Sequence, residues 1–176
     1  MTYAVEEAHP VTSAADTAAF LRGVRLFREF PAGDLDELTA CLREQELPSG
    51  QVLFREREPG DEMFFVRRGT VIISKAVTAQ VEEVLTRMGP GEFFGEMSLL
   101  DGAPRSATAR AVSDVLLLAL DRGNFQRFVA ASPRSAARFF RAYGEAVAER
   151  LRGTNDLVTE ATRWGLEATG LDTPVR

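Results

Sequence analysis

The sequence contains few of the side chains that enzymes most often use for nucleophilic catalysis or metal binding. Its 176 residues include one histidine, His9, and one cysteine, Cys41. These cannot build a His/Cys zinc site, which takes about three or four protein ligands. A lone cysteine excludes an internal disulfide and favours a reducing compartment. A catalytic triad would have to use His9, which lies in a polar N-terminal stretch, so the composition gives no support for one.

Long hydrophobic runs and an excess of basic charge are absent as well. The longest apolar run, Val115 to Leu120, has the length of a buried strand, whereas a transmembrane helix needs roughly 20 apolar residues. The N-terminus carries Glu6 and Glu7 and has no basic start before an apolar stretch, so it predicts no targeting signal. The net charge of −5 and the pI near 5.1 argue against a nucleic-acid binder that works through bulk charge. We therefore expect a cytoplasmic protein without a membrane segment.

What is present is typical of a folded domain. Hydrophobic residues make up 45% and charged residues 27% of the chain, and the length suits one domain with a helical extension. The pattern predicts a disordered tail over residues 1–16, a folded domain over 17–133, and a long C-terminal helix with a frayed tail over 134–176. Asp16 and Asp34 are expected to cap two N-terminal helices. The second would end before Pro48 and bury one face, which includes Leu35, Leu38, Cys41 and Leu42.

Between Gln51 and Leu120 the sequence pattern changes from helices to short strands separated by turns. Turn signals such as Pro59-Gly60-Asp61 and Gly89-Pro90-Gly91 recur along this stretch. The apolar runs between them cover residues 52–54, 63–66, 70–74, 83–88, 108–112 and 115–120. Evenly spaced short strands with glycine at the turns are typical of an antiparallel sandwich or small barrel. The sequence thus predicts an α+β fold, an antiparallel β jelly-roll barrel flanked by N-terminal helices and a long C-terminal helix.

The C-terminal region returns to a helical period. A short helix is expected over residues 124–131 and a long one from about Arg134 to Trp164. Five residues of the long helix follow one another at steps of four and three, the spacing of a helix-pairing seam: Val147, Leu151, Thr154, Val158 and Ala161. This seam could pack on the chain's own barrel or on a second copy. Because the helix outruns a small barrel, we favour a homodimer through residues 147–161.

The segment Phe94 to Ala111, FGEMSLLDGAPRSATARA, holds the side chains that suggest a ligand. Gly95 lets backbone approach closely, and the turn that follows it leaves outward N–H groups that suit an anion. Arg105 is a permanently charged fork that suits a phosphate, and Glu96 could accept a hydrogen bond from a neighbouring sugar hydroxyl. A phosphate and a hydroxyl on one small ring describe a cyclic nucleotide. Spacing alone leaves an alternative open, in which Glu96 and Arg105 form a buried ion pair that closes a loop.

This segment resembles the phosphate-binding cassette of the cyclic nucleotide-binding domains, a family that includes bacterial catabolite activators, regulatory subunits of cAMP-dependent kinase and cyclic nucleotide-gated channels. Gly60 to Ser74 is similar to the family's two-glycine strand-turn-strand, and the resemblance covers roughly residues 20–155. It implies that Glu96 accepts the ribose 2′-OH beside the Gly95 backbone. It also implies that Arg105 holds the phosphate together with a cradle made by Met97, Ser98, Ser106 and Ala107.

The resemblance also nominates residues near the base. The run RLRGTND, residues 150–156, is similar to the part of the family's long helix that reaches the base, which nominates Thr154 and Asn155. Thr154 is equally a residue of the seam. The base pocket would be lined by apolar strand residues such as Ile73 and Leu85.

Ser106 bears on which nucleotide binds. Several cGMP-selective members of the family have threonine at this position, so serine favours cAMP, with cGMP as the alternative ligand. Tyr143 and Trp164 either cover the base or pack within the protein. No metal is expected, because the strands carry none of the histidines that metal-binding jelly rolls use.

The resemblance implies a receptor module that binds cAMP and signals through its C-terminal helix to an effector protein that the sequence does not identify. Catabolite activators continue into a DNA-binding module of roughly 60 residues, and residues 165–176 are too few for it, so no direct DNA binding is expected. An alternative is a scaffold of the same fold that binds no nucleotide and self-associates through the long helix. An enzyme such as a phosphodiesterase is not expected, because no cluster of His or carboxylates supports hydrolysis.

Overall fold

The computed structural model describes residues 13–78 and 80–169. The helices are α1 (Ala14–Gly23), the 3-10 helix η1 (Arg25–Phe27), α2 (Ala32–Thr39), α3 (Glu96–Asp101), α4 (Arg122–Ala131) and α5 (Pro133–Thr169). The strands are β1 (Arg43–Leu47), β2 (Val52–Phe54), β3 (Glu62–Arg68), β4 (Val71–Ala76), β5 (Glu82–Met88), β6 (Phe93–Phe94), β7 (Thr108–Ala111) and β8 (Val115–Asp121).

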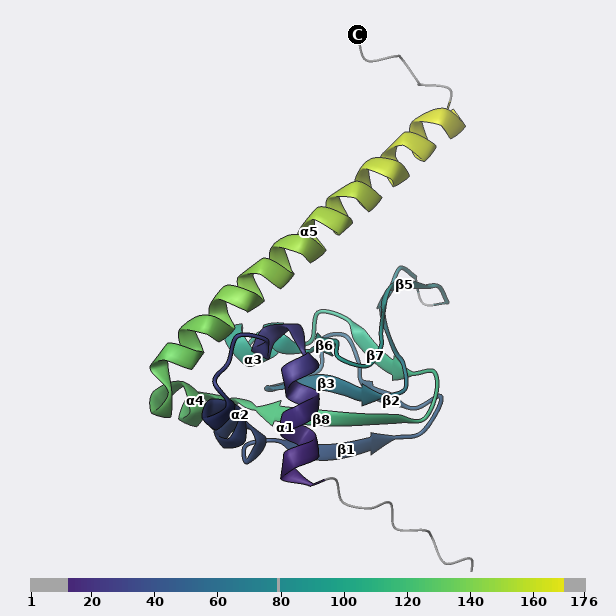
Figure 1. Cartoon of the computed structure of the whole chain (residues 1–176). Coiled ribbons are helices and arrows are strands. Elements are labelled where there is room, and N and C mark those ends of the chain that lie inside the picture. Colours follow the sequence, from purple (N-terminus) through teal and green to yellow (C-terminus); the bar gives the residue numbers. More distant parts are fainter. Residues whose placement is uncertain (1–12, 79, 170–176) are drawn as a thin grey trace, which may run out of the picture.

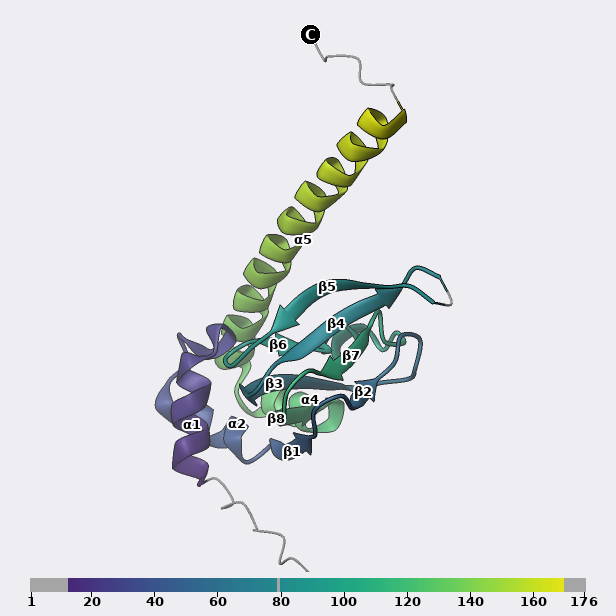
Figure 2. The same cartoon turned by 90° about the vertical axis from the view of Figure 1, so that its right-hand side faces the viewer.

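The strands form two antiparallel sheets of four strands each, in the orders β1-β8-β3-β6 and β2-β7-β4-β5. The N-terminal helices, α4 and the start of α5 gather on one side of the strands, and the β4–β5 hairpin projects on the other (Figures 1 and 2). The α+β jelly roll with a long C-terminal helix, predicted from the sequence, is confirmed.

The strands β3 and β8 have nearly unbroken apolar runs because both of their faces are buried. In β3, Met63 and Phe65 join the core on the helical side, while Phe64 and Val66 point into the core between the sheets. In β8, Leu118 and Leu120 join the helical side in the same way. Successive side chains of a strand point to opposite faces, so two cores need an apolar residue at every position.

A cluster of aromatic rings joins the base of α5 to the rest of the domain. Phe139 of α5 is 1% exposed, and its ring centroid lies 6.1 Å from that of Phe27 and 5.0 Å from that of Phe125. The Phe27 ring lies 5.2 Å from Phe65 of β3. This packing fixes where α5 begins and in which direction it leaves the domain.

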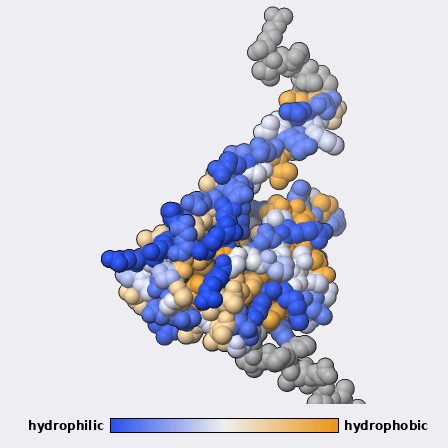
Figure 3. Space-filling view, viewed as in Figure 1, coloured by the Kyte–Doolittle hydropathy of each residue, from blue (hydrophilic) through white to orange (hydrophobic). Residues whose placement is uncertain are grey.

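Beyond its first turns, α5 extends away from the barrel (Figure 1). Ala146 is its last buried residue, and every residue of α5 from Leu151 to Thr169 is exposed. The seam therefore does not pack on the chain's own barrel: Val147, Leu151 and Val158 are 36%, 58% and 59% exposed. Figure 3 shows patches of apolar side chains on this otherwise hydrophilic helix.

Several predicted boundaries at the N-terminal end are wrong. Helix α1 begins at Ala14, because the hydroxyl of Ser13 accepts a hydrogen bond from the Asp16 backbone N–H and so caps the helix three residues before the expected cap, Asp16. Residues 13–16 are thus not part of a tail, and residues 1–12 lie outside the described residues. Helix α2 begins at Ala32 behind Pro31, so Asp34 lies in its first turn and is not the cap.

The second predicted helix is too long. It ends at Thr39, and residues 43–47 form strand β1, which pairs with β8 from Arg43 opposite Ala119 to Leu47 opposite Val115. Four of these five residues are polar, so their pattern does not reveal a strand. The backbone N–H and C=O groups of β8 hydrogen-bond to β1. Without β1 they would form an edge of the sheet with unpaired backbone groups. Cys41 lies after the helix, half-buried against the helical-side core.

Asp121 caps helix α4, and its contribution to stability should depend on pH. Its side chain accepts a hydrogen bond of 2.8 Å from the backbone N–H of Asn124, which is the main cause that lowers the pKa of Asp121. The fold therefore favours the charged form. Its stabilisation is present above the unfolded pKa of about 3.9 and is lost as the pH falls through the folded pKa.

We expect Asp121→Ala to lower the free energy of unfolding by about 1 kcal/mol at pH 7. Urea titrations at pH 7 and below about pH 3 measure the effect, and the difference from the wild type should shrink in acid. Asp121→Asn is the control, because asparagine caps helices well but carries no charge to lose. A deficit of the alanine variant that is as large in acid as at pH 7 contradicts the prediction.

Candidate functional site

A cavity of about 710 Å³ lies between the β4–β5 side of the barrel, the segment that includes α3, and the helix α5. This volume is within the range of about 300–1,000 Å³ that small-molecule sites occupy. Eight of the nine residues nominated from the sequence line it: Gly95, Glu96, Met97, Ser98, Arg105, Ser106, Ala107 and Thr154. Asn155 is not among the lining residues. Ile73 and Leu85, which the sequence places near a base, also line this cavity.

Gly95 turns the chain from β6 into α3 in a conformation that favours glycine. Its φ angle is +79°, in the left-handed region. A Cβ atom there would lie 2.9 Å from Nη1 of Arg105 and 3.0 Å from the carbonyl oxygen of Glu62. The backbone at Gly95 thus lies close to the Arg105 guanidinium.

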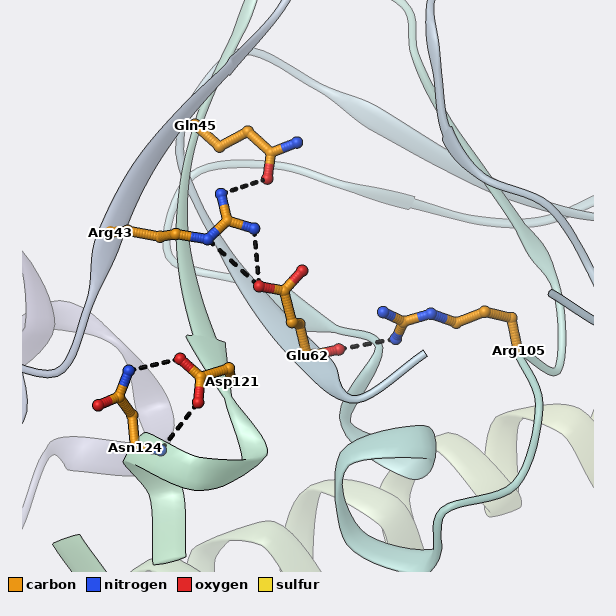
Figure 4. A network of polar contacts seen from close by, with 6 residues as sticks. All are labelled: Arg43, Gln45, Glu62, Arg105, Asp121 and Asn124. Atoms are coloured by element: carbon orange, nitrogen blue, oxygen red, sulfur yellow. Dashed lines mark hydrogen bonds and ion pairs between the residues drawn. The ribbon is translucent and has the colours of Figure 1, made fainter. Parts of the chain in front are cut away.

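Arg105 is buried, with 5% exposure, and backbone oxygens hold one corner of its guanidinium. Nη1 donates hydrogen bonds to the carbonyl oxygen of Glu62 at 2.7 Å and to that of Gly95 at 3.1 Å. Figure 4 shows the Arg105 side chain reaching the backbone carbonyl of Glu62, while the carboxylate of Glu62 turns toward Arg43. Nε of Arg105 is buried and has no hydrogen-bond partner among the described residues.

Among the residues that the structure describes, Arg105 differs from the other cations of the cavity wall in having no carboxylate partner. Arg25 pairs with Glu149, Arg150 with Glu96 at 2.8 Å, and Lys75 with Glu56 at 3.8 Å. Within the described residues, no carboxylate oxygen lies within ion-pair distance of Arg105. Burial lowers the pKa of Arg105 from its ordinary value, although Glu62 and Asp61 raise it from further away. The site thus holds a desolvated positive charge without a direct counter-ion from the described part of the chain.

Glu96 is also buried, with 6% exposure, and its partner comes from α5. Nη1 of Arg150 donates to its Oε1, while Nη2 of Arg150 donates to the carbonyl oxygen of Phe93 at 2.6 Å. The Arg150 guanidinium carbon lies 4.5 Å above the Phe93 ring. The alternative in which Glu96 and Arg105 pair with each other is therefore wrong.

Four further nominated residues of the cavity wall make contacts of their own: Met97, Ser98, Ser106 and Thr154. Ser98 is 2% exposed, and its carbonyl oxygen accepts a hydrogen bond of 2.5 Å from Nη2 of Arg122, which anchors α3 to the start of α4. Met97 is 50% exposed, and the Ser106 hydroxyl faces its sulfur at 3.6 Å. Thr154 lies in the cavity wall and also in the seam, and its hydroxyl donates to the carbonyl oxygen of Arg150.

The two candidate lid residues differ. Tyr143 packs against the helical-side core, with its ring parallel to that of Phe139 at 6.4 Å, and burial raises its pKa. Trp164 is 68% exposed and does not line the cavity. Sequence reasoning missed Arg150, Arg25, Phe54 and Lys75 as residues of the cavity wall. No local pattern marks them, because each reaches the cavity from an element that only folding brings there.

The jelly roll, the short helix after Gly95 and the buried arginine beside the cavity define a jelly-roll domain with a candidate small-molecule site. Residues 44–132, about half of the chain, match the family described as cyclic nucleotide-binding domain. The chain belongs to this family, as the resemblance of residues 94–111 implied.

Relatives of this chain include channels and transcriptional regulators. It is 44% identical over 116 residues to a cyclic nucleotide-gated potassium channel of Mesorhizobium japonicum, a match that covers 66% of this chain and 31% of the channel. It is 31% identical over 131 residues to a CRP-like cAMP-activated global transcriptional regulator of Mycobacterium tuberculosis, covering 74% of this chain and 57% of the regulator. The chain thus spans between about a third and somewhat over half of these relatives.

Solved structures show the same fold. The N-terminal domain of a transcriptional regulator from Streptomyces coelicolor superposes with a TM-score of 0.66 at 38% identity, over 79% of this chain and 94% of that one.

Within residues 13–78 and 80–169, no helix is both long and apolar enough to cross a membrane. No three His, Cys, Asp or Glu side chains of these residues are grouped as metal ligands would be.

Proposed function

We propose that this chain binds a cyclic nucleotide, cAMP in preference to cGMP, in the cavity beside Arg105. The observation that carries the proposal is the buried guanidinium that has no carboxylate partner among the described residues although it lines a cavity of about 710 Å³. A desolvated charge of this kind favours an anionic ligand that restores its hydrogen bonds. Relatives whose names state activation by cAMP or gating by cyclic nucleotides support this ligand class.

Each nominated residue has a place in this proposal. Arg105 donates to the cyclic phosphate, and backbone or hydroxyl groups of the cradle complete its hydrogen bonds: Met97, Ser98, Ser106 and Ala107. Glu96 accepts the ribose 2′-OH beside the backbone of Gly95. Thr154 and Asn155 approach the base from α5. For Asn155 this requires a movement of α5, because the residue does not line the cavity.

Ligand binding is coupled to α5 through Arg150. The carboxylate proposed to accept the ribose hydroxyl is the same group that holds Arg150, and a neighbouring ion pair joins Glu149 of α5 to Arg25 of η1. A ligand that occupies Glu96 changes the contacts that hold α5 at the cavity. It thus shifts the population of α5 positions by as much as its differential affinity for them. An effector protein or a second copy would read this movement.

Isothermal titration of the full chain with cAMP and with cGMP, together with thermal denaturation, tests the proposal. We expect heat of binding with cAMP, weaker binding of cGMP, and a rise in stability of about 2.7 kcal/mol at a hundred times the dissociation constant. Neither heat nor a thermal shift with either nucleotide at millimolar concentration would refute it. Unchanged cAMP after prolonged incubation is expected as well, because we propose a receptor and not an enzyme.

The exposed seam of α5 favours a second candidate, a scaffold that self-associates whether or not nucleotide is present. Under either proposal, we expect Leu151→Asp together with Val158→Asp to convert a dimer into a monomer, because a buried charge in a helix seam lacks a partner. Sedimentation velocity with and without cAMP measures this, with the off-seam change Thr159→Asp as control. A dimer that ignores cAMP in a chain that binds none would favour the scaffold. A wild type that is monomeric at every concentration would exclude self-pairing.

A further inference from the structure

The guanidinium of Arg105 lies over the rings of Phe54 and Phe64, which pack together with a third ring, Phe94. The ring centroids of Phe64 and Phe94 are 5.5 Å apart in a stacked arrangement, and Phe54 lies 6.0 Å from Phe64 and 6.1 Å from Phe94. Phe64 and Phe94 belong to the buried core between the sheets, and Phe54 packs against that core while also lining the cavity. The three rings thus pack as one group that extends from the buried core to the cavity wall.

Phe54 is the ring closest to the charge. The guanidinium carbon of Arg105 lies 4.1 Å from the centroid of Phe54 and 5.6 Å from that of Phe64. A cation within about 6 Å of a ring centroid is attracted to the ring face, and the attraction is larger where water is excluded. Gly60 crowds the same group, since a Cβ atom there would lie 2.1 Å from Nε and 2.5 Å from Cζ of Arg105.

The hydrogen bonds of Arg105 leave its orientation incompletely fixed. Both bonds to Glu62 and Gly95 come from Nη1, so no hydrogen bond within the described residues holds the other two nitrogens of the planar group, Nε and Nη2. The face of an aromatic ring removes this freedom, because the guanidinium lies against it. The remaining donors, Nε and Nη2, are then held in one arrangement before any ligand arrives, which lowers the entropy cost of binding a phosphate.

We infer that Phe54 is a positioning residue for the phosphate-binding arginine, an inference that rests on the proposed function of Arg105. Phe54 acts through the orientation of the guanidinium and not through a hydrogen bond of its own. Phe54 belongs to strand β2, which pairs with β7 beside the cassette but lies far from it in the sequence, so residues 94–111 alone do not reveal it.

Titration of the full chain with cAMP tests the inference first through Phe54→Leu. We expect roughly tenfold weaker binding, which lies between the effect of an exposed cation–π contact and that of a fully desolvated one. Phe54→Tyr keeps the ring face and should bind within about twofold of the wild type. Leu53→Ala is the matched control, because Leu53 packs on the same core from the same strand. It should lower the melting temperature and leave the affinity nearly unchanged.

Repeating the Phe54→Leu change in a chain that already carries Arg105→Lys distinguishes positioning of the arginine from direct contact with the ligand. Arg105→Lys keeps the positive charge but has no planar group to orient, so adding Phe54→Leu to it should weaken binding less than about threefold further. An equal tenfold loss in both backgrounds would overturn the inference, since Phe54 would then contact the ligand itself. Wild-type affinity in Phe54→Leu would overturn it as well.

A ligand-free measurement keeps the inference testable if the wild type binds no cAMP, a result that would refute the proposed function alone. In the NMR spectrum of the free protein, the Nε–H signal of Arg105 should be shifted by the ring current and protected from exchange with water. In Phe54→Leu it should move to the position of a solvated arginine and exchange faster. An Nε–H signal that stays in place and remains protected in this variant would overturn the inference.

Discussion

Arg105→Ala is expected to weaken cAMP binding by about a hundredfold or more. A hydrogen bond between a charged donor and an anionic acceptor contributes about 1.5–3 kcal/mol, and a guanidinium can donate two in parallel to one phosphate. Tenfold in affinity corresponds to about 1.4 kcal/mol. The alanine variant loses both bonds and the only cation of the cavity wall that has no carboxylate partner within the described residues.

Two controls make this result specific. Arg105→Lys keeps the charge without the planar fork, so an intermediate loss of roughly tenfold is expected. Arg110→Ala removes an arginine of the adjoining strand β7 that pairs with Glu82 at 2.8 Å and does not line the cavity, so its affinity should match the wild type. Isothermal titration measures all three, and circular dichroism checks that each variant is folded. Affinity within threefold of the wild type in folded Arg105→Ala would show that Arg105 does not bind the ligand.

Phe139→Ala is expected to have the largest effect on stability, a loss of about 3–5 kcal/mol in the free energy of unfolding. The Phe139 ring is 1% exposed and touches rings from η1, α4 and α5, so its removal leaves a cavity where these helices meet. For a chain of this size, the loss corresponds to a fall of about 10 °C in melting temperature.

The neighbouring residue supplies the control. Phe140 has the same side chain at the next position of α5, but 46% of its surface is exposed, so Phe140→Ala should cost about 1 kcal/mol or less. Urea and thermal unfolding followed by circular dichroism compare the two variants. Equal losses would mean that the ring cluster at the base of α5 is not what holds this helix to the domain.

The strands of the barrel could be predicted wherever burial dictates the side chains. The runs at 63–66 and 115–120 are apolar throughout because their alternate residues fill two different cores, and both runs were assigned correctly. Strand β1 was missed, because four of its five residues are polar and only its pairing with β8 makes it a strand. Strand β6, only two residues long, carries too short a pattern to predict.

Some residues of the candidate site could likewise be predicted from the sequence and others could not. The residues of the segment 94–111 could be nominated because their spacing is local: Gly95 turns the chain, α3 follows, and Arg105 returns to the same place after a short loop. The partners of these residues could not, because they lie far along the chain. Arg150 meets Glu96 across 54 positions, and Phe54 meets Arg105 from strand β2.

The sequence by itself determined the family, the jelly roll, the residues of the cassette, and the shortage of histidine and cysteine that leaves no His/Cys zinc site. Those conclusions depend on composition and on spacings within one segment, which a chain carries before it folds. Only the tertiary structure decided that Glu96 holds Arg150, that Arg105 lies on Phe54 without a carboxylate partner in the described chain, and that the seam of α5 is exposed. The physical reason is that contacts between distant residues, burial and ion pairing depend on how the helices and strands pack against one another. Composition and local spacing do not specify that packing.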